Sequence, residues 1–211
     1  DPKKQDFSDE KVIDIFRNGK TTGIFQFSSN GMKNTLKKLD VRNLDDLSVA
    51  NAMFRPGAMA YIDNFCKRRK GLEEFEYLHP DLKPILENTY GIIVFQEQLI
   101  EIGRYAGIHN PDLLRKATGK KNPTLLAQVK PELHDKLIEK GWTEEQFDKL
   151  WEDMLAFARY SFNKAHSQSY ALIAFLTAKQ KAYYPAEFFA GLCNSYIGHS
   201  DYVRDTAYEI I

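Results

Sequence analysis

Apolar and polar positions recur along most of the chain with the three-to-four-residue spacing of amphipathic helices. This pattern predicts short helices in "SSNGMKNTLKKL", "LDDLSVANAMF" and "HPDLKPIL". Pro56 and Gly57 end the second of these helices, and Pro80 suits the first turn of the third. The run "TTGIFQF" is interpreted as a strand or an extended lead-in. The segment "YGIIVFQEQLIEIGRY" is expected to begin extended and to turn helical around Gln96.

Two Asn-Pro pairs, at residues 110–111 and 122–123, each place a good N-cap before a proline that is harmless in a first turn. They predict helices in "PDLLRKATG" and in "PTLLAQVKPELHDKLIEK", the second ended by Gly141. Because proline lacks a backbone N–H, Pro131 is expected to kink or split that second helix.

Thr143 and Gln146 have the spacing of a capping box and predict a helix that runs to about Arg159. After a break at "SFNKA", a helix without acidic residues is expected to reach Tyr184, and Pro185 starts another. The sequence shows no internal repeat, low-complexity tract or linker. It therefore predicts one continuous, mostly α-helical assembly with at most a few short strands.

The composition is that of an ordinary globular chain, with 43% apolar and 27% charged residues among 211. No apolar run approaches the roughly 18 residues that a membrane span needs. Cys66 and Cys193 are the only thiols, so no disulfide or zinc framework is implied and a reducing cytoplasm is expected. The first residues lack both a signal-peptide core and an initiator methionine, which suggests a piece of a longer protein.

The balance of 29 basic and 29 acidic residues argues, taken alone, against a nucleic-acid binder. The distribution of charge indicates otherwise, because residues 113–131 and 154–186 contain no acid and "KRRK" occupies 67–70. An anion could bind at such stretches, although solvated lysine faces would explain any one of them as well.

The motifs of common enzymes are missing: GxGxxG, GxxxxGK[ST], HExxH and CxxC. No Asp-x-Asp pair offers a scaffold for two metal ions, and the five histidines have no ligand spacing, so no metal site is expected. Two clusters remain. In the first, Arg115 and Lys116 lie within a predicted helix and Lys120 and Lys121 at its end. The helix dipole explains the last two well and Arg115 poorly.

The second cluster, in "SFNKAHSQSY", places Asn163, Lys164 and His166 where a helix begins. Exposed N–H groups with a lysine and an imidazole form an anion site, and an N-cap beside an incidental lysine is the alternative. The residues thus predict a helical protein with two candidate phosphate-binding entrances.

Six stretches resemble, in order and approximate spacing, the fingers region of the alpha subunit of bacterial DNA polymerase III, the C-family replicative polymerase. They are "GIFQFSSNGM", "NAMFRPGAM", "HPDLKPILENTYGIIVFQEQ", "LLRKATGKK", "FNKAHSQSYALIAF" and "KAYYPAEFFAGL". The resemblance is clearest from Thr22 to Leu192. It implies a palm-to-fingers connection with first helices at 1–40, a helical fingers domain at 41–195 and the truncated start of a further helical segment at 196–211.

The resemblance implies template-directed nucleotide transfer in DNA replication, with Mg²⁺ held by palm aspartates outside this chain. The chain alone is therefore predicted to be inactive. The implied partners are primer–template DNA, deoxynucleoside triphosphates, the remainder of the polymerase, a sliding clamp and other replisome subunits, and no membrane.

The resemblance also implies nucleotide-binding residues: Arg115, Lys116, Lys120, Lys121, Asn163, Lys164 and His166. Arg55, Gln96 and Gln98 match family motifs too, and turn geometry and internal hydrogen bonds explain them about equally well. The family usually has two arginines at 115–116, and Lys116 lacks the planar fork of the second. Thr118, Ser161, Phe95 and the alanine of "RPGA" also depart from the usual pattern and suggest a divergent member.

Two other classes remain open on the residues alone. A non-catalytic helical nucleic-acid-binding module would explain the basic, acid-free segments equally well. A structural helical domain whose basic clusters contact a protein partner is the third hypothesis. Loss of nucleotide binding in single cation variants would favour the polymerase fingers hypothesis. Steep salt dependence of binding, spread over many lysines, would favour the nucleic-acid-binding module.

Overall fold

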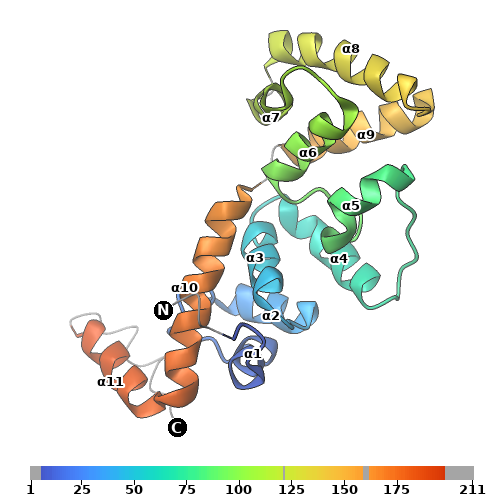
Figure 1. Cartoon of the computed structure of the whole chain (residues 1–211). Helices are drawn as coiled ribbons and strands as arrows, with labels where there is room; N and C mark the ends of the chain where they lie inside the picture. The colour runs from blue at the N-terminus through green and yellow to red at the C-terminus, as the bar shows by residue number, and fades with distance from the viewer. Residues whose placement is uncertain (1–5, 121, 159–161, 198–211) are drawn as a thin grey trace. The chain divides into compact units, whose positions relative to one another are not determined.

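The computed structural model describes residues 6–120, 122–158 and 162–197 of the chain. Within these ranges the protein is all-α, as expected (Figure 1). The only β-type pairing in the same ranges is one isolated parallel bridge between Phe95 and Phe162. The helices are α1 (Glu10–Arg17), α2 (Asn30–Leu39), α3 (Leu44–Met53), α4 (Ile62–Arg69), α5 (Lys83–Leu86), α6 (Gln96–Ala106), α7 (Pro111–Lys120), α8 (Pro123–Glu139), α9 (Glu144–Ala158), α10 (Lys164–Tyr183) and α11 (Pro185–Ser195). Among the helices so described, none combines the length and apolar character that a bilayer crossing needs.

The predicted helix starts are confirmed where their capping residues are local. The Asn122 side chain accepts hydrogen bonds from the N–H groups of the second and third residues of α8. At the start of α9, Gln146 Oε1 accepts from Thr143 N at 3.0 Å and Thr143 Oγ1 accepts from Gln146 N at 3.2 Å. This is the reciprocal capping box that the spacing predicted.

The predicted split of the α8 segment is wrong, because α8 runs without interruption through Pro131. A proline within a helix leaves the carbonyl four residues earlier without its N–H donor. Here both Pro131 and Ala127 are exposed, so water can bond the freed carbonyl.

Three further segments differ from the expectation. The run "TTGIFQF" forms tight turns rather than a strand, with positive φ angles of 76° at Gly23 and 64° at Gln26. Neither α1 nor α4 was anticipated. The sequence of α4 had been noted only for its basic cluster, although Ile62 and Phe65 bury an apolar face beneath it.

The described residues form two compact units, residues before 55 together with those after 164, and residues 55–164. The predicted domain boundaries at 40 and 195 remain predictions. The first unit packs α1, α2 and α3 with α10 around a core that includes Phe16, Phe27 and Phe175. Ser167 ties α10 to α3 by donating its hydroxyl to Ser48 O at 2.6 Å.

The second unit contains α4 to α9, and within it α7 packs against α6, α8 and α9. Its core includes Leu99, Leu114, Leu133 and Phe147, each 2% exposed or less.

Candidate functional site

Two sequence motifs separated by more than sixty residues meet in the second unit. Phe162 donates its N–H to Val94 O at 3.1 Å and accepts from Gln96 N at 2.9 Å. These two hydrogen bonds form the parallel bridge between Phe95 and Phe162. The bridge joins "FQEQ" to "FNK", so the predicted phosphate entrance at α10 is attached to the start of α6.

Glu97 completes this junction with its carboxylate. Asn163 Nδ2 donates to Glu97 Oε1 at 2.8 Å, and the backbone N–H of Lys164 donates to Glu97 Oε2 at 2.8 Å. A carboxylate at a helix N-terminus is also favoured by the helix dipole. The Lys164 N–H, one of the groups predicted to bind an anion, is therefore already hydrogen-bonded to Glu97.

Two predicted cations lie against the aromatic rings of this junction. The Arg55 guanidinium carbon is 4.2 Å from the centroid of the Phe162 ring, within the range of a cation–π contact. Lys164 Nζ lies 5.8 Å from the centroid of the Phe95 ring. Burial lowers the pKa of Arg55 from its usual value. Arg55 is half-buried and lies against the Phe162 ring, next to the bridge.

Gln98 is a structural residue by its surroundings. Its side chain is 5% exposed, and Oε1 accepts from the N–H groups of Val94 and Phe95 at 2.8 and 2.9 Å. Its Nε2 donates to Thr89 Oγ1 at 2.8 Å and to Ile85 O at 3.3 Å. Since both ends of the amide are used, the internal-hydrogen-bond explanation of Gln98 is favoured over ligand contact. Gln96 is half-buried, and its backbone N–H belongs to the bridge.

The α7 cluster is organised by an acid that the sequence reasoning missed. Arg115 Nε lies 2.8 Å from Asp112 Oδ1, and Lys116 Nζ lies 2.7 Å from Asp112 Oδ2. The hydrogen bonds from Arg115 and Lys116 lower the pKa of Asp112 to about 2. The spacings of three and four residues bring these side chains together on one helix face, which was the available signal. The Lys120 side chain and all of Lys121 lie outside the described residues.

His166 lies in the first unit, exposed on α10. Its ring centroid is 4.2 Å from that of Tyr170, one turn along the helix, and Tyr170 is 5.1 Å from Phe25. Tyr170 had not been singled out, although a spacing of four residues places two side chains on one helix face.

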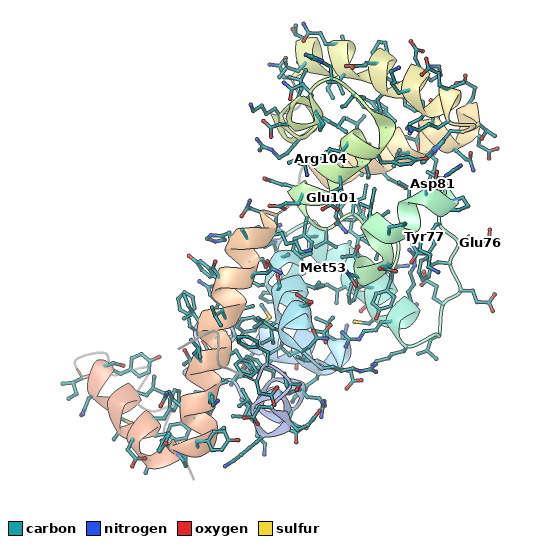
Figure 2. All side chains as sticks on the ribbon, in the orientation of Figure 1. Met53, Glu76, Tyr77, Asp81, Glu101 and Arg104 are labelled. Carbon is teal, nitrogen blue, oxygen red and sulfur yellow. The ribbon has the colours of Figure 1, made fainter. Side chains whose placement is uncertain are left out.

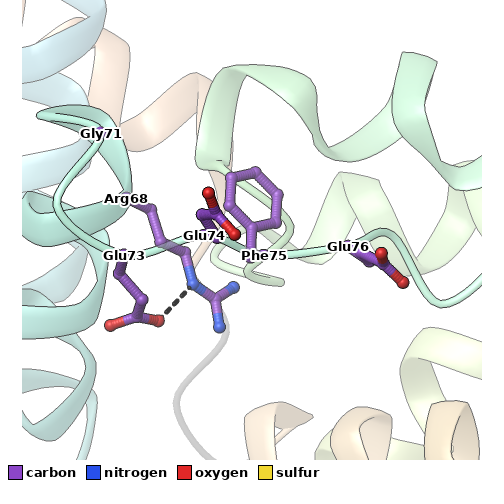
Figure 3. Close-up of a pocket in the computed structure, with 6 residues that line it drawn as sticks. All are labelled: Arg68, Gly71, Glu73, Glu74, Phe75 and Glu76. Carbon is purple, nitrogen blue, oxygen red and sulfur yellow. Dashed lines mark hydrogen bonds and ion pairs between the residues drawn. The ribbon is translucent and has the colours of Figure 1, made fainter.

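Two hollows in the described part of the second unit have a different chemistry. One is lined by Arg68, Gly71, Glu73, Glu74, Phe75 and Glu76 (Figure 3). Arg68 Nε donates to Glu73 Oε1 at 2.8 Å, and the other charged side chains of the lining, Glu74 and Glu76, are acidic. A second cavity, of about 350 Å³, has apolar residues in its lining, among them Leu82, Leu86 and Leu150. Neither offers the surplus of cations that a phosphate requires.

The described residues thus form a helical domain with cations in the middle of α7 and at the start of α10. Residues 1–141 match the model of the bacterial DNA polymerase III alpha subunit finger domain, and the chain belongs to this family. The resemblance seen in the sequence is thereby confirmed.

Relatives named DNA polymerase III subunit alpha match nearly the whole chain. The protein of Aquifex aeolicus is 46% identical over 187 residues, which are 86% of this chain and 16% of the relative. The protein of Bacillus subtilis is 38% identical over 206 residues, 96% of this chain and 18% of the relative. That of Campylobacter jejuni is 40% identical over 195 residues, 90% and 16%. The chain thus spans less than a fifth of the length of these relatives.

Proposed function

We propose that the chain is the fingers segment of a DNA-directed DNA polymerase of bacterial replication, and that its cations bind the triphosphate of the incoming deoxynucleotide. Membership of the finger-domain family supports the first part. The observation that carries the second is the convergence of Arg115 and Lys116 on the carboxylate of Asp112. The partners proposed with this role are primer–template DNA, the rest of the polymerase, a sliding clamp and other replisome subunits, in the cytoplasm.

The Asp112 cluster is well suited to exchange a carboxylate for a phosphate. Exposed ion pairs contribute only about 0–1 kcal/mol, so little free energy holds the cations on Asp112. The side chains of Asp112 and Lys116 are 41% and 52% exposed, which leaves both within reach of a ligand. A triphosphate offers more charge than a single carboxylate and should take over both cations. Lys120 and Lys121 are proposed to add to the same charge.

At the start of α10, Asn163, Lys164 and His166 are proposed as further contacts of the nucleotide. Lys164 contributes a charge on a flexible stem, and the imidazole of His166 contributes an N–H donor. Arg55 and Gln96 are proposed to support these residues rather than to reach the ligand, since Arg55 stacks on Phe162 and the Gln96 N–H lies in the bridge.

The chemistry of bond formation is proposed to lie outside the chain. Within the described residues no group of three metal-ligating side chains comes together. We assign Mg²⁺ to palm aspartates of a longer polymerase, as in the family the sequence resembles. The 211-residue chain mixed with Mg²⁺, dNTPs and primer–template is expected to extend no primer, and extension above background would overturn this.

The test is nucleotide binding by single variants of the chain. Calorimetric titration with dATP is expected to give a Kd about tenfold higher for Arg115→Ala and for Lys164→Ala, because each loses a charge-assisted contact of about 1.4 kcal/mol. Lys149→Ala is the control, since Lys149 is also a cation paired with an aspartate of its own helix, Asp153 at 2.9 Å on α9. It should leave the Kd unchanged.

Salt dependence separates this proposal from a duplex-binding surface. A nucleotide site should respond to two or three particular residues. A duplex surface should lose affinity steeply with salt and respond to many lysines alike. If Arg115→Ala, Lys164→Ala and Lys149→Ala all bind dATP as the unmodified chain does, the triphosphate role is wrong.

A further inference from the structure

Three consecutive residues at the start of α10 are each bonded to the segment that opens α6. Phe162 is held by two backbone hydrogen bonds, Asn163 by its side-chain amide and Lys164 by its backbone N–H. The last two bonds both end on Glu97, one on each carboxylate oxygen. We propose that Glu97 is a positioning residue, which fixes Asn163 and Lys164 for contact with the nucleotide. This inference rests on the proposed function.

The geometry explains why a carboxylate is needed here. Its two oxygens lie in one plane and can each accept from a separate donor, so a single side chain fixes both the amide of Asn163 and the backbone of Lys164. Glu97 is half-buried, so water competes only in part for these bonds. Fixing the Lys164 backbone determines where its side chain starts, and therefore the volume that its ammonium group can reach.

If Glu97 acted only through its negative charge, the effect of removing it on nucleotide affinity would have the opposite sign. A negative charge near a triphosphate-binding lysine repels the ligand, so removing that charge should tighten binding. If Glu97 positions the segment, removing it should weaken binding instead. The sign of the change therefore decides between the two roles.

Glu97→Gln makes this distinction with little change of shape. The glutamine has one acceptor oxygen and one NH₂ group. With the Asn163 amide oriented as in the structure, that NH₂ group must face one of two donors, Asn163 Nδ2 or the Lys164 N–H. Glu101→Gln is the matched control, because Glu101 is exposed one turn further along α6 (Figure 2). It removes the same charge without touching the segment.

Two measurements on the 211-residue chain test the proposal. Hydrogen exchange of the Lys164 amide, followed by NMR, should become at least about tenfold faster in Glu97→Gln and stay unchanged in Glu101→Gln. The Kd for dATP should rise about tenfold in Glu97→Gln, and stay the same or fall slightly in Glu101→Gln. A circular dichroism melt confirms that each variant is folded.

Glu97→Asp keeps the test decisive if the glutamine variant does not fold. Aspartate keeps the charge but is one methylene shorter, so it cannot reach both donors. Positioning predicts weaker dATP binding for Glu97→Asp, and a role of charge alone predicts no change.

The outcomes separate this inference from the proposed function. If Arg115→Ala and Lys164→Ala weaken dATP binding while Glu97→Gln binds as tightly as Glu101→Gln or better, positioning by Glu97 is refuted and the nucleotide site stands. If Lys164→Ala leaves the Kd unchanged, the contact through which Glu97 would act is absent, and both fail at this residue. Faster exchange of the Lys164 amide would then report a structural bond only.

Discussion

The starts of α7 and α10 both carry cations beside a carboxylate, but the carboxylates come from different distances along the chain. At α7, Asp112 lies three and four residues before the side chains that it pairs, Arg115 and Lys116. At α10, Glu97 comes from another helix and bonds a backbone N–H and an amide 67 and 66 residues away. Both acids are partly exposed, so the two pairings differ in range and in the groups that they bond. The first pairing is local and joins side chains only, and the second is long-range and includes a backbone N–H.

This difference implies different roles for the two acids. The Asp112 pair is made by flexible side chains on one helix face, and it can open without disturbing the fold. The Glu97 bonds join the starts of two helices, and breaking them leaves the backbone bridge of Phe162 to hold that junction. We therefore expect acids at the α7 start to affect charge and ligand exchange, and acids at the α10 start to affect stability and geometry.

The largest effect is expected one residue beyond Glu97, at the buried Gln98. Gln98→Ala removes the acceptor of two backbone N–H groups and the donor to Thr89. Because buried donors are left unsatisfied, the free energy of unfolding should fall by about 3 kcal/mol. Urea denaturation measures this. The exposed Gln128 on α8 provides the control, and Gln128→Ala should change the stability by less than about 0.5 kcal/mol.

The next prediction tests the comparison directly with two alanine variants. Glu97→Ala should lower the free energy of unfolding by about 2 kcal/mol, because it breaks charge-assisted hydrogen bonds in a partly buried junction. Asp112→Ala should lower it by no more than about 0.5 kcal/mol, as usual for an exposed ion pair. Urea unfolding of both variants under one buffer gives the two values. Equal losses would show that the local and the long-range acids contribute alike, contrary to the comparison.

What the sequence could predict follows the same division. The helix starts at Asn122 and Thr143 were predicted because their caps lie within three residues of the groups they bond. The pairing of Asp112 with Arg115 is equally local, and its i,i+3 spacing is a signal that the sequence contains. Glu97 was noted only as part of a family motif, since no local pattern shows that α6 and α10 start side by side.

The fold shows where local rules were insufficient. Pro131 has a strong local preference to break a helix, but its exposed position lets water satisfy the carbonyl, so α8 continues. The α1 helix is only eight residues long, too short to be stable alone. It is stabilised by tertiary packing, which buries its apolar residues Val12, Ile13 and Phe16. Burial of this kind depends on partners distant in the sequence.

The smallest expected effect is the pH dependence of the Asp112 pair. Its pKa in the folded protein is about 2, below the ordinary value of an aspartate, because Arg115 and Lys116 bond the charged form. A carboxyl group with a lowered pKa stabilises the folded state above its unfolded pKa of about 3.9, and this contribution is lost as the pH falls through about 2. The exposed geometry limits this contribution to less than about 1 kcal/mol, and salt should reduce it further.

An NMR titration of the Asp112 carboxyl carbon measures the pKa directly. In Arg115→Ala the midpoint should move up toward that of an ordinary aspartate, because the first of its two donors is gone, whereas in Glu97→Gln it should stay near 2, because that acid acts on the other helix start. A midpoint that shifts with Glu97 and ignores Arg115 would mean that the two sites are coupled and that the α7 pair is not local.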